Sequence, residues 1–165
     1  MTPAFDIDLD LVRKYNRPAP RYTSYPPATQ FADDFAQAEV LESTKQSEGP
    51  LSLYFHIPFC ESLCWYCGCT THITRDSAKA EHYLGYLIRE LELVAAQLHP
   101  ERKVAQLHFG GGTPNFLSPA LIDQLAEAIH ANFTFAPDAE CSVELDPRTL
   151  SREHIAAFRR MGLNR

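Results

Sequence analysis

From Gly49 onward, short apolar segments alternate with longer amphipathic ones, and this alternation limits the fold more than any other feature of the sequence. Residues 51–57, 104–109 and 140–145 have the length and composition of strands. Each is followed by a segment with helical spacing, at about 77–98, 118–130 and 151–161. Strands that alternate with helices predict an α/β fold with a parallel sheet.

Local signals refine the three predicted helices. The first carries an apolar stripe made of Leu84, Leu87, Ile88, Leu91, Val94 and Leu98. The second begins with Ser118 as N-cap and Pro119 at its first position, and it buries Leu121, Ile122, Leu125 and Ile129. The third extends from Ser151 to about Met161, and Gly162 follows as a left-handed cap.

Each predicted strand has one apolar face and one polar face, because strand side chains alternate between faces. The apolar set is Leu51, Leu53, Phe55, Ile57, Ala105, Leu107, Phe109, Cys141, Val143 and Leu145. The polar set is Ser52, Tyr54, His56, Gln106, His108, Ser142 and Glu144. A sheet covered on both faces, or a tightly filled barrel, would need more apolar residues. The pattern predicts an open or wide barrel with helices outside and a polar ligand inside.

The two ends of the chain differ from this central pattern. Residues 1–49 are rich in proline and aromatic residues, so we expect an irregular, turn-rich N-terminal arm before a core domain of residues 50–165. Residues 163–165 have the character of a fourth strand that has just begun. A parallel sheet of only three strands would expose an edge, so we expect the chain to be part of a longer protein.

Composition restricts the setting of the protein. The net charge of −6 argues against a nucleic-acid partner, and no apolar stretch is long enough to span a membrane. Five cysteines without a secretory signal indicate a reducing compartment, so we expect a cytoplasmic location.

The strongest chemical signal is the cysteine spacing C-x3-C-x2-C formed by Cys60, Cys64 and Cys67, directly after the first strand. Loops in this position form the active sites of α/β proteins. Three thiolates on a four-iron cluster would leave one iron open to a small molecule. The alternative of a structural zinc site would use Cys69 as fourth ligand, but such sites usually draw on two separated cysteine or histidine pairs.

Longer motifs add a resemblance. The three-cysteine spacing, with Tyr66 before the third cysteine, resembles the radical S-adenosylmethionine (SAM) superfamily. More narrowly, RYTSYP (21–26), SLYFHIPFC (52–60), CWYCGC (64–69), QLHFGGGTP (106–114) and SVELDPR (142–148) resemble the oxygen-independent coproporphyrinogen III oxidase family. The resemblance covers residues 8–165 and implies the N-terminal part of a partial (β/α)6 radical SAM barrel with parallel strands, about three βα units.

The resemblance assigns roles to individual positions. Cys60, Cys64 and Cys67 would hold a 4Fe–4S cluster, and Cys69 would be a catalytic residue that is not a cluster ligand. The family binds two SAM molecules, and their contacts in this chain would be Tyr54, Tyr66, Gly111, Gly112, Thr113 and Glu144. Arg21, Tyr22 and Tyr25 in the arm would either cover the cavity and hold substrate propionates or belong to a tail without fixed contacts.

The implied reaction is the oxidative decarboxylation of two propionates of coproporphyrinogen III to vinyl groups, which gives protoporphyrinogen IX. It needs an electron donor to the cluster, and the resemblance implies a monomer that is inactive without the remaining strands. One rival is a haem-chaperone-like relative that binds haem without decarboxylation, although such relatives typically lack Cys69 and the RYTSYP arm. The other rival is the structural zinc module.

Overall fold

A computed structural model describes residues 8–16, 26–34 and 36–165. The chain divides into two compact units, Met1–Ala36 and Gln37–Arg165, and each is described by itself. The first contains helix α1 (Leu9–Tyr15), whose N-terminus is capped by the Asp8 side chain, and the short 3-10 turn η1 (Ala28–Gln30). Arg21, Tyr22 and Tyr25 lie outside the described residues, and the boundary at residue 49 stays a prediction.

The second unit is built on a parallel three-stranded sheet in the order β1–β4–β5. Its strands are β1 (Leu51–Ile57), β4 (Lys103–Gly111) and β5 (Thr134–Val143). The parallel pairing confirms the expected α/β class, and β1 has the predicted bounds. In contrast, β5 begins six residues before the predicted strand at 140, and its pairing with β4 shifts register between Val104 and Gln106.

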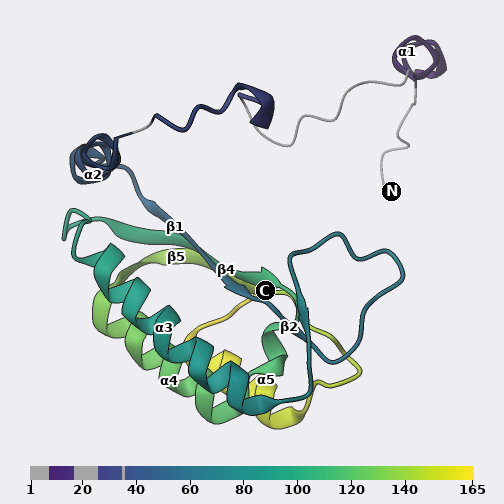
Figure 1. Ribbon diagram of the computed structural model, residues 1–165, viewed down its shortest axis with the longest axis vertical. Coiled ribbons are helices and arrows are strands. Elements are labelled where there is room, and N and C mark those ends of the chain that lie inside the picture. The colour runs from purple at the N-terminus through teal and green to yellow at the C-terminus, as the bar shows by residue number, and fades with distance from the viewer. Residues whose placement is uncertain (1–7, 17–25, 35) are drawn as a thin grey trace, which may run out of the picture. The chain divides into compact units, whose positions relative to one another are not determined.

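Three helices cover one face of this sheet (Figure 1): α3 (Ser77–Ala95), α4 (Pro119–Asn132) and α5 (Arg152–Met161). The apolar strand face packs on them, and Ile57, Leu107 and Phe109 are almost completely buried. The opposite face carries the predicted polar side chains. Three expectations were wrong: Val94 is exposed, Leu145 lies beyond the end of β5, and the register shift buries Val104 more fully than Ala105.

The caps of the helices agree with the sequence signals. Ser118 accepts a hydrogen bond from the Leu121 amide, and Pro119 occupies the first position of α4. Ser151 forms a capping box with His154, and Gly162 ends α5 with φ of 101°. Glycine avoids the steric cost that a Cβ would bring in this left-handed conformation.

Two further helices lie in the segment for which an irregular arm was expected. They are α1 and α2 (Gln37–Gln46), and neither has a buried residue. Neither helix buries an apolar stripe, which explains why periodicity did not reveal them, and α1 is stabilised locally by its Asp8 cap.

Residues 163–165 continue the sheet beyond β5. The amides of Asn164 and Arg165 donate to the Cys141 carbonyl, and the Val143 amide donates to the Arg165 carbonyl. The Asn164 side chain accepts a hydrogen bond from the Cys141 amide. This segment therefore occupies the place that a fourth parallel strand would take.

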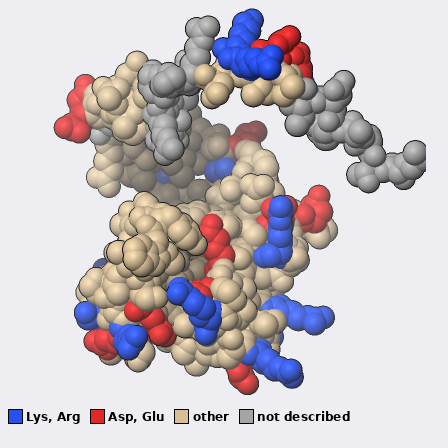
Figure 2. Space-filling model, turned by 90° about the vertical axis from the view of Figure 1, so that its right-hand side faces the viewer, with Lys and Arg blue, Asp and Glu red and all other residues tan. Residues whose placement is uncertain are grey.

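The surface of the second unit carries both signs of charge. Acidic and basic side chains are interspersed on the face seen in Figure 2. Within the part of the chain that the structure describes, the helices are too short or too polar to cross a bilayer.

Burial distinguishes two helical isoleucines and gives a test of the packing. Ile122 on α4 is fully buried, whereas Ile155 on α5 is 52% exposed. We expect Ile122→Ala to lower the free energy of unfolding by about 2–5 kcal/mol, because it leaves a cavity. Ile155→Ala should cost less than about 1 kcal/mol. Urea denaturation of both variants measures the difference, and equal losses would contradict the described packing.

Candidate functional site

A loop of residues 61–71 carries most of the cysteines and is tied at its base by a second, two-stranded sheet. Strands β2 (Phe59–Cys60) and β3 (His72–Ile73) pair in parallel. The His72 amide donates to the Pro58 carbonyl, and the Thr74 amide donates to the Cys60 carbonyl. Cys60 is therefore held at the rigid base of the loop, while Cys64, Cys67 and Cys69 lie within it.

The glycine-rich segment at the end of β4 comes close to this base. The Gly112 amide donates to the Ile57 carbonyl at 2.8 Å. A Cβ on Gly112 would lie 2.8 Å from the Phe59 carbonyl oxygen and 2.9 Å from the Cys60 sulfur. Only glycine permits this approach. The neighbouring Thr113 hydroxyl donates to the Cys60 sulfur at 3.4 Å.

The polar strand face forms a connected network beside the loop. The Tyr54 hydroxyl bonds His56 Nδ1 at 3.0 Å, and His56 Nε2 bonds the Thr70 carbonyl at the end of the cysteine loop. The Tyr54 ring also stacks on His108. His56 and His108, which the sequence placed on the polar strand face, are therefore both hydrogen-bonded in this network.

Glu144 lies just after β5 and is held by two groups. Its amide donates to the Phe109 carbonyl at 3.0 Å, and its carboxylate lies 3.6 Å from His108 Nε2. His108 Nδ1 is fixed in turn by the Ser142 hydroxyl. The Glu144 side chain is 61% exposed. Partial burial raises the pKa of Tyr54, and the Glu144 charge raises it further.

The cysteine loop, the glycine-rich segment and the turn after β5 enclose a pocket of about 840 Å³. All predicted site residues except Tyr54 line it: Cys60, Cys64, Tyr66, Cys67, Cys69, Gly111, Gly112, Thr113 and Glu144. The five cysteines are free thiols. Within residues 8–16, 26–34 and 36–165, no three acidic, histidine or cysteine side chains converge as a preformed metal-ligand set.

Cys69 and Tyr66 are both exposed in this pocket. Desolvation raises the pKa of the Cys69 thiol although the residue is exposed, and the neighbouring Cys67 and Glu144 add to the rise. These neighbours favour the protonated thiol because each is a source of negative charge.

Asn115 is a residue that the sequence analysis missed. It is 3% exposed, and its amide group clamps the turn after β5 against the glycine-rich segment. Its Oδ1 accepts from the Asp146 amide, and its Nδ2 donates to the Asp146 carbonyl and the Thr149 hydroxyl. A single asparagine after a proline gives no sequence signal for such a role.

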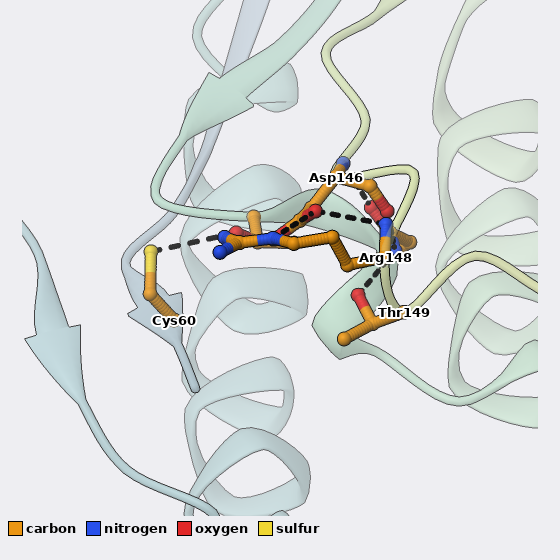
Figure 3. Close-up of polar contacts among 6 residues, drawn as sticks. Cys60, Asp146, Arg148 and Thr149 are labelled. Carbon is orange, nitrogen blue, oxygen red and sulfur yellow. Dashed lines mark hydrogen bonds and ion pairs between the residues drawn. The ribbon is translucent and has the colours of Figure 1, made fainter. Parts of the chain in front are cut away.

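The clamped turn presents Arg148 to the pocket (Figure 3). Its Nε and Nη2 donate to the Asp146 carboxylate at 2.7–3.2 Å, and its amide donates to the same carboxylate. These bonds lower the pKa of Asp146. The same bonds raise the pKa of Arg148, and Cys64 makes a smaller contribution to this rise. In the sequence, the available signal for Arg148 as a site residue was its place in the turn that follows a parallel strand.

Comparison with known proteins identifies the family. The model of the radical SAM superfamily matches residues 54–165. This chain belongs to the radical SAM superfamily. A solved structure of the radical SAM enzyme coproporphyrinogen III oxidase from Escherichia coli superimposes with a TM-score of 0.83 at 43% identity. That match covers 96% of this chain and 35% of the solved one, and it confirms the predicted fold.

Curated relatives agree with the structural match. Proteins named oxygen-independent coproporphyrinogen III oxidase are 47% identical in Salmonella typhimurium and 46% identical in Escherichia coli, each over 97% of this chain. A Pseudomonas aeruginosa protein of the same name is 42% identical over 96% of it. The chain spans 35% of the length of each of these relatives.

Radical SAM membership implies a 4Fe–4S cluster and SAM, and the pocket suits both. Three free thiols with the superfamily spacing line it, and the missing Cβ of Gly112 leaves room beside Cys60. The volume is in the range of small-ligand sites. These donors fit an iron–sulfur cluster, and membership replaces the structural zinc module considered above.

Two of the three glycines that line this pocket provide a matched test. A methyl group on Gly112 would collide with backbone atoms and the Cys60 sulfur, whereas a methyl group on Gly68 meets nothing within 4 Å. We expect Gly112→Ala to reduce the iron retained per protein after anaerobic reconstitution by at least about half. Gly68→Ala should retain the parental iron content. Equal iron in both variants would show that the close approach at Gly112 does not support the cysteine site.

The Asn115 clamp gives a separate stability prediction. Asn115→Ala removes three hydrogen bonds and strands polar groups of the Asp146 backbone. We expect a loss of about 1–3 kcal/mol in the free energy of unfolding. Asn132→Ala serves as control, because its side chain makes one exposed bond to the Ala128 carbonyl. Chemical denaturation that finds the two variants equally stable would contradict the clamp.

Proposed function

We propose that this chain supplies the cofactor-binding part of an oxygen-independent coproporphyrinogen III oxidase. The enzyme decarboxylates two propionates of coproporphyrinogen III to vinyl groups and so forms protoporphyrinogen IX. The observation that carries this proposal is the 42–47% identity to enzymes of that name over nearly the whole chain, with Cys69 present in the same pocket as the three-cysteine motif.

Three cysteines are proposed to bind the cluster. Cys60, Cys64 and Cys67 line one pocket and have the spacing of the superfamily. Three ligands leave one of four irons for the amino and carboxylate groups of SAM. When bound, the cluster and SAM together supply the 5′-deoxyadenosyl radical that removes a substrate hydrogen.

The other predicted site residues are proposed to position two SAM molecules. Tyr54, Gly111 and Glu144 would contact the first, with Glu144 oriented by its own amide bond and by His108. The second would lie against Tyr66, Gly112 and Thr113, where the backbone can approach a ligand without side-chain obstruction. Cys69, a thiol held close to Cys67, is proposed to act in catalysis rather than as a cluster ligand.

The wider setting belongs to the same proposal. An external electron donor reduces the cluster, the protein acts as a cytoplasmic monomer, and neither nucleic acid nor membrane is a partner. Cys69 argues against the haem-chaperone-like alternative, since the resembling chaperones typically lack this cysteine. The chain carries about one third of the relatives' length, so turnover is proposed for a protein that includes the remaining strands.

Alanine variants of the cysteines test these roles in the protein expressed from its complete gene. Cys60→Ala, Cys64→Ala and Cys67→Ala should each lose the cluster and abolish 5′-deoxyadenosine formation, since each removes one of three ligands. Cys69→Ala should keep the cluster but lose at least about 90% of propionate decarboxylation. Cys141→Ala is the matched control, because Cys141 is buried in the core away from the pocket.

Anaerobic iron analysis, visible spectra and product chromatography measure these outcomes. The proposal fails if the unaltered protein binds the cluster and SAM yet leaves coproporphyrinogen III intact. Haem binding without decarboxylation would then favour the chaperone-like alternative.

A further inference from the structure

Arg148 occupies a position that the proposed roles above do not use. It lies on the turn after β5 and lines the same pocket as Cys64. Asp146 engages its Nε and Nη2 in a fork, and Nη1 is the guanidinium nitrogen outside that fork. Figure 3 shows the side chain extending from Asp146 toward the side of the pocket where Cys60 lies.

The support beneath Arg148 is unusually rigid for a residue whose side chain is 62% exposed. The Asp146 side chain is only 18% exposed and accepts bonds from both the Arg148 amide and its guanidinium. The Asp146 backbone is clamped on both its amide and its carbonyl by buried Asn115. A surface ion pair made for stability alone would gain little from such support. The geometry fixes where the cation lies.

The cation faces the pocket that the cysteines line. Arg148 lines the same pocket as Cys60, Cys64 and Cys67, and its side chain extends toward the side where Cys60 lies. Hydrogen bonds to cluster sulfurs and positive charge nearby raise the reduction potential of an iron–sulfur cluster. The reason is that reduction adds one electron, and a fixed cation stabilises the additional negative charge.

We propose that Arg148, positioned by Asp146 and Asn115, holds its positive charge beside the cysteines of the cluster and raises the reduction potential of the cluster. This inference rests on the proposed cluster at Cys60, Cys64 and Cys67. It makes Arg148 a positioning and tuning residue for electron uptake from the donor. Asn115 and Asp146 act through it.

Three variants test the inference in the anaerobically reconstituted protein without SAM. Arg148→Gln removes the charge, Arg148→Lys keeps the charge but loses the planar fork, and Arg159→Gln removes an equal charge on α5 away from the pocket. The cluster is titrated with dithionite and mediators, and its reduced form is quantified by electron paramagnetic resonance. Iron content per protein confirms equal loading.

At the potential where the unaltered cluster is half reduced, Arg148→Gln should lower the ratio of reduced to oxidised cluster about three- to tenfold. A tenfold change corresponds to about 59 mV for a one-electron couple. Arg148→Lys should show a smaller fall, and Arg159→Gln should stay within about twofold of the unaltered protein. If Arg148→Gln loses the cluster, the ratio of reduced to oxidised cluster in Arg148→Lys is compared with that in Arg159→Gln, and a fall in Arg148→Lys alone supports the inference.

The inference is overturned if the cluster has the same reduction potential in both Arg148 variants as in Arg159→Gln. If those variants instead raise only the KM for SAM or substrate, Arg148 binds a ligand carboxylate and does not tune the cluster. An unaltered protein that assembles no cluster overturns both this inference and the proposed function. A loaded cluster with unchanged potentials overturns the inference alone.

Discussion

The site depends on the close backbone approach between the ends of β1 and β4. Parallel pairing brings Ile57 opposite Gly111, and the next amide, that of Gly112, donates to the Ile57 carbonyl. The chain can continue this closely only because Gly112 has no side chain where the Phe59 carbonyl and the Cys60 sulfur lie. This contact sets the first cysteine against the glycine-rich segment, and the remaining pocket is assembled around it.

The two faces of the sheet divide the structural and chemical roles. The apolar face is buried by α3, α4 and α5, which makes the strands a rigid support. The polar face carries Tyr54, His56 and His108. His56 connects this face to the cysteine loop through its bond to the Thr70 carbonyl. His108 connects it to the Glu144 carboxylate. The buried face thus supports the strands, and the contacts of the polar face connect them to the residues of the pocket.

The sequence predicted those parts of the fold that follow from periodicity and local capping. Strand β1, the caps Ser118 and Gly162, and the division between apolar and polar faces were anticipated. The early start of β5 and the burial of Val104 were not, because a register shift depends on the neighbouring strand. Val94 falls on the helical stripe but is exposed, because the stripe alone does not show which of its residues another element covers. Tertiary contacts decide such positions.

The candidate site was predicted only where a motif carries it. The four cysteines of residues 60–69, Gly112 and Glu144 belong to recognisable strings and line one pocket. The clamp made by Asn115 and the fork between Asp146 and Arg148 depend on contacts across more than 30 residues or on side-chain orientation, which no spacing rule encodes. The central claim is a four-iron cluster with one iron left open by three cysteine ligands. Mössbauer spectra of protein reconstituted anaerobically with iron-57 test it most directly. On addition of SAM, one iron in four should change its isomer shift, whereas four sites that do not respond to SAM, or no four-iron cluster at all, would contradict it.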